Sequence, residues 1–98
     1  MKIIALEKEL PGATSVQFAS YLKAEAEKVW QLYQVGLVRE FYFRQDQSTA
    51  VLVLECLDLQ EARNILAEMP LVQNGLIEFE LIPLKPYRGF ARLFTSTP

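Results

Sequence analysis

The strongest constraint on the fold of this chain is the order in which its hydrophobic patterns follow one another. Residues 2–9, 37–45 and 76–84 alternate from face to face, and residues 49–57 form an almost continuous apolar run. Both patterns are typical of β-strands. Residues 15–34 repeat apolar side chains at helical spacing, as does the segment between the third and fourth strands. The order is therefore strand, helix, strand, strand, helix, strand.

Capping residues mark the ends of the two predicted helices. Thr14 and Gln17 form a capping-box pattern, so the first helix begins beside them and ends before Gly36. Asp58 marks the start of the second helix, and Pro70 closes it. With right-handed crossovers, this order predicts an α+β, ferredoxin-like βαββαβ fold, in which a four-stranded antiparallel sheet carries two helices on one face.

The composition favours a single domain that associates with copies of itself. The chain has 98 residues, so one domain spanning residues 1–98 is expected. Hydrophobic residues make up 51% of it, a high share for a small domain with an unfavourable surface-to-volume ratio. We expect the excess to be buried in a homodimer or a higher homo-oligomer. The net charge of −2 predicts no nucleic-acid partner, and no apolar stretch approaches the ~18 residues of a membrane span.

Two residue types narrow the possible chemistry. Cys56 is the single cysteine, and its apolar surroundings indicate a small buried hydrophobic residue rather than a nucleophile. The sequence contains no histidine, which removes the usual zinc sites and every Ser-His or Cys-His pair. We expect no metal site and no cofactor, so proton transfer would use Glu, Asp, Lys, Tyr or water. One cysteine and a start without a signal-peptide pattern favour the cytoplasm.

The predicted edge strands each present one wholly apolar face. Phe41, Phe43, Ile77, Phe79 and Leu81 form these faces, which we expect to pack against the helices. The opposite face is apolar but also charged. It carries Glu40, Tyr42, Arg44, Leu76, Glu78, Glu80, Ile82 and Leu84. A second copy of the chain would cover such a surface, and two sheets face to face would form a closed barrel.

The polar residues of that outward face have two interpretations. Glu78 and Glu80 either line the enclosed barrel, where they would contact a small molecule, or lie at a wet edge and discourage strand pairing. Tyr42 is a candidate hydrogen-bond donor and Arg44 a candidate anion partner, and Glu40, two residues before Tyr42, lies on the same face and is a candidate substrate contact. Alternatively, Tyr42 and Arg44 form an ordinary pair on the strand surface.

Three stretches resemble the muconolactone isomerase-like branch of the dimeric α+β barrels. They are "LKAEAE" (22–27), "EMPL" (68–71) and "IEFELIPLKP" (77–86). They are similar to an L-K-A-D-E run, a Leu-Pro-Leu and a last strand of I-E-V type with a closing proline in that group. The resemblance covers roughly residues 15–86 and rests on order and spacing. It implies a ferredoxin-like fold, a homodimer or a ring of dimers, and a small-molecule pocket between helices and sheet.

The resemblance implies a cofactor-independent isomerase that moves a proton within an unsaturated small acid or lactone. Such a reaction needs a carboxylate base in a partly dry pocket and a cation or donor near the developing enolate. Lys23 matches the family's lysine and Glu25 its first acidic residue, while Ala26 stands at the second acidic position. Helical geometry places Glu25 beside the apolar arc of the helix, with Lys23 at the other border. Both are also interpretable as boundary residues whose stems cover the core.

Two further features complete the functional expectations. Trp30 lies at the rim of the apolar arc and is a candidate substrate contact. The tail, residues 85–98, mixes three cations with aromatic side chains, and we expect it to pack across a partner subunit. Two functions compete with an isomerase. They are a non-catalytic small-ligand-binding or assembly module, and a cofactor-free monooxygenase of the same superfamily.

Overall fold

The computed structural model describes residues 1–95, and within them the strands form one antiparallel sheet. The strands are β1 (Lys2–Glu9), β2 (Val38–Phe43), β3 (Ala50–Glu55) and β4 (Ile77–Pro83), in the spatial order β2-β3-β1-β4. The continuous apolar run thus lies centrally, between β2 and β1, as its pattern predicted. The predicted α+β, ferredoxin-like fold is confirmed.

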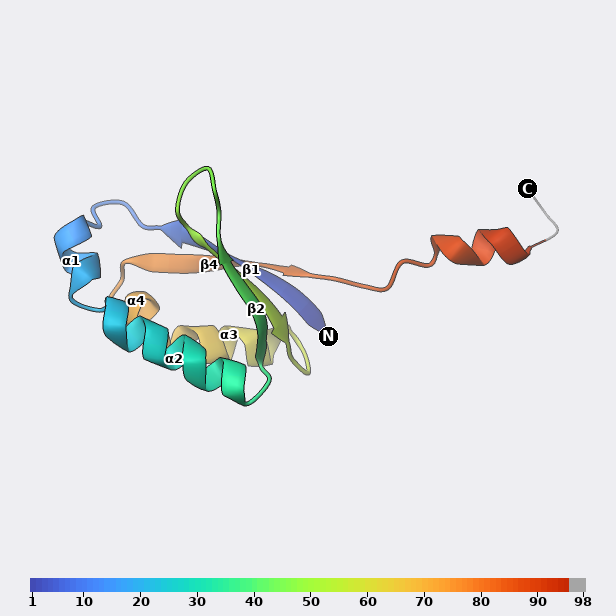
Figure 1. The fold of residues 1–98 in the computed structure, drawn as a ribbon, viewed down its shortest axis with the longest axis horizontal. Coiled ribbons are helices and arrows are strands. Elements are labelled where there is room, and N and C mark those ends of the chain that lie inside the picture. Colours follow the sequence, from blue (N-terminus) through green and yellow to red (C-terminus); the bar gives the residue numbers. More distant parts are fainter. Residues whose placement is uncertain (96–98) are drawn as a thin grey trace.

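The helices all lie against one face of the sheet (Figure 1). They are α1 (Ser15–Ala19), α2 (Leu22–Gln34), α3 (Leu59–Ala67) and α4 (Pro70–Gln73). The Thr14–Gln17 capping box is present at the start of α1, and Asp58 caps α3. In the part of the chain described, no helix combines the length and apolarity needed to cross a bilayer.

Two details of the helix prediction are wrong. A single helix over residues 15–34 was expected, but Ser20 and Tyr21 separate α1 from α2. The break allows Phe18 and Tyr21 to pack on one small cluster around Leu71 and Ile77. The segment after Pro70 was expected to be a loop, but it forms α4, because a proline is readily accepted at the first position of a helix.

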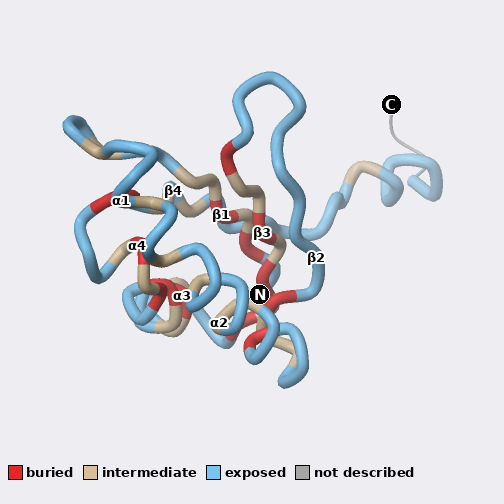
Figure 2. The backbone as a smooth tube through the Cα atoms, turned by 60° about the vertical axis from the view of Figure 1, so that its left-hand side comes forward, coloured by how far each residue is buried: buried red, intermediate tan, exposed pale blue. Residues whose placement is uncertain are grey.

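The main core lies between the sheet and the helices α2 and α3 (Figure 2). β1 contributes Ile3 and Ala5, which pair with Leu54 and Leu52 of β3 and share their helix-facing side. From α3 and the turn after it come Ala62, Leu66 and Met69, the stripe that the sequence predicted. Burial of this apolar surface is the main source of the fold's stability.

The predicted facing of the edge strands is confirmed, with one exception. Ile77, Phe79 and Leu81 of β4 pair with the helix-facing residues of β1. Leu76 was placed on the outward face, but it is buried in the cluster with Leu71 and Ile77. The reason is that Leu76 precedes the strand, so the alternation of β4 does not apply to it.

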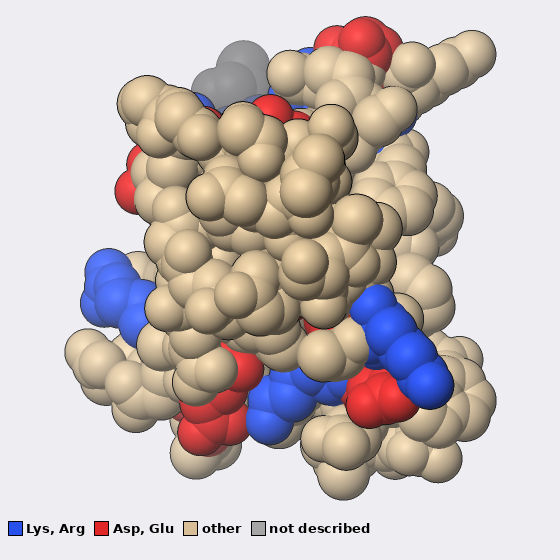
Figure 3. All heavy atoms as spheres, turned by 90° about the vertical axis from the view of Figure 1, so that its left-hand side faces the viewer, with Lys and Arg blue, Asp and Glu red and all other residues tan. Residues whose placement is uncertain are grey.

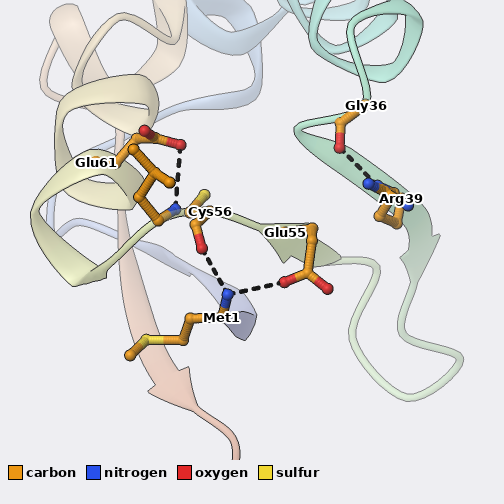
Figure 4. A network of polar contacts seen from close by, with 7 residues as sticks. Met1, Gly36, Arg39, Glu55, Cys56 and Glu61 are labelled. Carbon is orange, nitrogen blue, oxygen red and sulfur yellow. Dashed lines mark hydrogen bonds and ion pairs between the residues drawn. The ribbon is translucent and has the colours of Figure 1, made fainter.

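Polar contacts tie the start of β1 to the end of β3 (Figure 4). The amino group of Met1 donates to the carbonyl oxygen of Cys56 at 2.6 Å and pairs with the Glu55 carboxylate at 3.0 Å. Cys56 is buried, as expected, and burial raises the pKa of its thiol. Nearby, Arg39 donates to the carbonyl oxygen of Gly36 at 2.6 Å. Arg39 lies at the bulge that interrupts the pairing of β2 with β3.

The C-terminal tail leaves the body of the molecule (Figure 1). It contains a 3₁₀ helix, η1 (Gly89–Phe94), and its large side chains are exposed, with Phe94 at 85%. The tail explains a radius of gyration of 16.7 Å, compared with about 13 Å for a compact domain of this size. The last three residues lie outside the described part of the chain.

The burial of β3 predicts the effect of shortening its side chains. Leu54 is 0% exposed, whereas Leu57, three residues later, is 84% exposed. We expect Leu54→Ala to lower the free energy of unfolding by about 2–5 kcal/mol, because it leaves a cavity, and Leu57→Ala to change it by at most ~0.5 kcal/mol. Urea denaturation at one fixed protein concentration measures both. Equal losses in the two variants would contradict this description of the core.

Candidate functional site

A cleft of about 930 Å³ opens between α1 and α2 on one side and the helix-facing surface of the sheet on the other. Its apolar walls come from both layers. The helical wall includes Phe18, Leu22, Ala26, Val29 and Trp30, and the sheet wall includes Phe41, Phe43, Ala50, Leu52 and Phe79. A cleft of this size and character is typical of small-molecule sites.

The cleft exists because the helices leave part of the apolar sheet surface uncovered. Phe41 and Phe43 lie on the helix-facing side, as predicted, yet both are exposed. Tyr33 of α2 meets the edge of Phe41 with ring centres 5.8 Å apart, and it stacks on Trp30 at 5.9 Å. These rings connect α2 to β2, and two of them, Trp30 and Phe41, line the cleft.

Glu25 enters the cleft from the first turn of α2. Its Oε1 accepts a hydrogen bond of 2.9 Å from the backbone N–H of Leu71. That N–H lies in the first turn of α4, where helical N–H groups have no partner within the helix. Desolvation in the half-buried position raises the pKa of the Glu25 carboxyl, and the hydrogen bond from Leu71 opposes this effect.

Glu7 enters the same cleft from the sheet. Its Oε1 accepts a bond of 3.3 Å from the N–H of Ala50, just beyond the last paired residues of β1 and β3. Burial raises the pKa of Glu7 as well, and the charge of Glu9 adds to the increase. The charge of Glu7 in turn raises the pKa of Glu25. The two carboxylates therefore interact across the cleft.

This arrangement suits proton transfer. A carboxyl group whose pKa is raised toward neutrality is a better base once ionised and a better acid while protonated. Glu25 and Glu7 stand in an apolar, partly desolvated cleft that can hold a small molecule between them. Within residues 1–95, His, Cys, Asp and Glu side chains form no group of three or more that could hold a metal ion.

The structure places the other predicted site residues in different positions. Trp30 lines the cleft and Tyr42 lies at its edge. Lys23 is exposed and is not part of the cleft lining. The hydroxyl of Tyr42 donates to Glu40 at 2.7 Å, and this hydrogen bond raises the pKa of Tyr42. Tyr42 and Glu40 thus form a pair on the strand surface.

The remaining candidates lie outside the cleft. Arg44 binds both carboxylate oxygens of Asp46, at 2.9 and 2.7 Å, and this bond lowers the pKa of Asp46. Glu78 and Glu80 are exposed on the outward face of β4, and Glu80 pairs with Lys8 at 3.1 Å. That face is opposite the cleft, so the predicted residues do not converge on one site in a single chain.

Sequence reasoning missed Glu7. The signal was available, because the alternation that puts Ile3 and Ala5 toward the helices puts Glu7 on that side too. A carboxylate on the apolar face of a strand is unusual and marks a candidate site. The α1 end of the molecule presents a broad uncharged surface with charged side chains at its margins (Figure 3).

Comparisons with known proteins show the fold. No family model and no curated protein sequence matches the chain. A structure of muconolactone isomerase matches with a TM-score of 0.74 and 16% identity, over 90% of this chain and 92% of that one. 5-Chloro-2-hydroxyhydroquinone dehydrochlorinase from Burkholderia phenoliruptrix, in complex with 2,5-dihydroxybenzoquinone, matches with a TM-score of 0.67 and 16% identity, over 91% and 98%. The chain therefore has the ferredoxin-like α+β fold of these proteins, as the resemblance in the sequence implied.

Proposed function

We propose that this protein binds an unsaturated small molecule in the cleft and moves a proton within it, with Glu25 as the base. The observation that carries the proposal is a half-buried carboxylate with a raised pKa in an apolar cleft of about 930 Å³. The fold shared with muconolactone isomerase supports the same reaction class. Glu25 also stands at the first acidic position of the resemblance in α2.

The proposed reaction is balanced in protons and electrons. Glu25 takes a proton from the ring carbon next to the double bond of an α,β-unsaturated lactone, and the C–H electron pair moves through that double bond into a dienolate. Collapse of the dienolate shifts the double bond, and a carboxyl group returns a proton to the carbon at its far end. Glu25 can return the proton itself, and Glu7, on the opposite wall, is a second acid in position to do so.

One observation favours a non-catalytic ligand-binding protein instead. Ala26 replaces the second acidic residue of the resemblance, and Glu25 has a structural task as acceptor for the N–H of Leu71. In that case the cleft would bind its ligand without changing it. Turnover distinguishes the two functions, because both predict binding and only the first predicts proton exchange.

We further propose that two copies associate through the outward faces of their sheets. This face carries Ile4, Leu6, Val51, Val53, Ile82 and Leu84, which are half-buried or exposed in the single chain. Charged residues such as Lys8 and Glu80 stand among them as an ion pair. Apolar side chains in a contiguous patch of this kind favour association. The tail would then be available to pack on a partner subunit.

The first test of the reaction is Glu25→Gln. Gln keeps an oxygen that can accept from Leu71 but cannot act as a base, so we expect proton exchange to fall by about 10²-fold or more. The assay follows exchange of ring hydrogens of muconolactone and its methyl ester in D₂O by proton NMR. Glu27→Gln, an exposed site on the same helix, is the control. Equal exchange by wild type and Glu25→Gln would remove Glu25 as the base.

The rate should depend on pH through the carboxyl groups of the cleft. Because Glu25 must be ionised to accept a proton, we expect the rate to rise with pH, with a midpoint above 4.5 since burial raises its pKa. The folded state holds this proton more tightly than the unfolded state. Its contribution to stability is therefore present at low pH and is lost as pH rises through the raised pKa. A rate that is flat from pH 4 to 8 would contradict the assignment.

The proposed association predicts the mass of the protein in solution. We expect light scattering to give at least a dimer for wild type and a shift toward monomer for Ile82→Lys, which puts a charge on the outward face. Leu57→Lys, at an exposed position outside the sheet, should leave the mass unchanged. A wild-type monomer at micromolar concentration would refute the association.

A further inference from the structure

The charged groups that line the cleft all have one sign. They are Glu7 and Glu9 from β1 and Glu25 from α2. No Lys or Arg side chain of the described residues belongs to the lining. In a partly desolvated cleft, charges of one sign act on a ligand more strongly than they would in water. An anionic ligand would therefore be repelled by three carboxylates at neutral pH.

The nearest cations do not neutralise these carboxylates. A smaller hollow of about 450 Å³ shares Glu7 and Glu9 with the cleft and is lined by Lys8 and Arg44 as well. Each of these cations already has a carboxylate partner. Lys8 pairs with Glu80 at 3.1 Å, and Arg44 binds Asp46 at 2.7 Å. The hollow therefore offers no unpaired cation to a carboxylate-bearing ligand.

We propose that the cleft selects an uncharged substrate, such as a lactone or phenol without a free carboxylate, and that Glu7, Glu9 and Glu25 exclude anionic analogues of the same skeleton. This inference rests on the proposed function, and it narrows the substrate class of that site. The apolar walls would hold the unsaturated ring, and the carboxylates would accept hydrogen bonds from its hydroxyl groups.

Thr49 offers an uncharged polar contact beside the cleft, to a ligand that extends into the smaller hollow. It lines the smaller hollow and is buried, and its Oγ1 has no hydrogen-bond partner among the described residues. Buried polar atoms are normally paired, so an unpaired hydroxyl beside a hollow is available to a ligand. A hydroxyl can donate to or accept from a neutral oxygen without adding charge.

The experiment compares two ligands that differ only in charge. Muconolactone carries a free carboxylate at pH 8, and its methyl ester has the same ring without that charge. Binding of each to the full chain is followed by the fluorescence of Trp30, the single tryptophan, which lines the cleft and is 56% exposed. We expect the ester to bind at least about tenfold more tightly at low salt, with a smaller ratio at high salt because salt screens the charges.

The variant Glu7→Gln tests the cause of the selection. Removing one carboxylate should tighten binding of the acid several-fold relative to binding of the ester, whereas Glu78→Gln, on the outward face, should leave the ratio of the two affinities unchanged. Circular dichroism confirms that each variant is folded before binding is compared.

The outcomes separate the two proposals. Equal or tighter binding of the acid would overturn charge selection and leave the proposed function standing. It would also indicate that a cation reaches the cleft from elsewhere, and the tail carries Lys85, Arg88 and Arg92. Failure of both compounds to bind would overturn the proposed function, and the inference with it. Both proposals are supported if wild type binds the ester more tightly than the acid and if Glu7→Gln reduces that difference in affinity.

Discussion

The helical layer of this protein is smaller than the apolar surface of the sheet that it covers. Ile3, Ala5, Leu52 and Leu54 are sealed beneath α2 and α3. Phe41 and Phe43 lie on the same side of the sheet and are left exposed. Because these exposed rings belong to β2, an apolar cleft lies beside the core. The proposed binding and proton transfer in the cleft depend on that incomplete coverage.

Ionised carboxylates in such a cleft lower the stability of the folded state. Their raised pKa values mean that the folded state disfavours the ionised form relative to the unfolded chain. Glu7 and Glu25 are held nonetheless, each by one backbone N–H, from Ala50 and Leu71. Both N–H groups lie where regular pairing ends, one beyond a strand ladder and one in the first turn of α4. The carboxylates therefore take part in the local structure while remaining open to the cleft.

The sequence predicted the architecture well because its information is local and periodic. Strand order, helix caps and the facing of Phe79 and Leu81 follow from alternation and capping chemistry. The errors arose where tertiary contacts override that information. The break at Tyr21 depends on packing against Leu71 and Ile77, which are distant in sequence. Leu76 was assigned by extending an alternation past the end of its strand.

The site was harder to predict than the fold because it joins two layers. Glu25 was identified from helical geometry, yet its partner in the cleft, Glu7, comes from β1, and only the packing of α2 on the sheet brings them together. In the sequence resemblance, a second acidic residue directly follows the one that matches Glu25, and this position is Ala26 here. Glu7 brings a second carboxylate into the cleft from the sheet. If Glu7 serves as the second acidic residue, the proposed proton transfer uses one carboxylate from the helical layer, Glu25, and one from the sheet, Glu7. The identity of the ligand then follows from electrostatics as much as from shape.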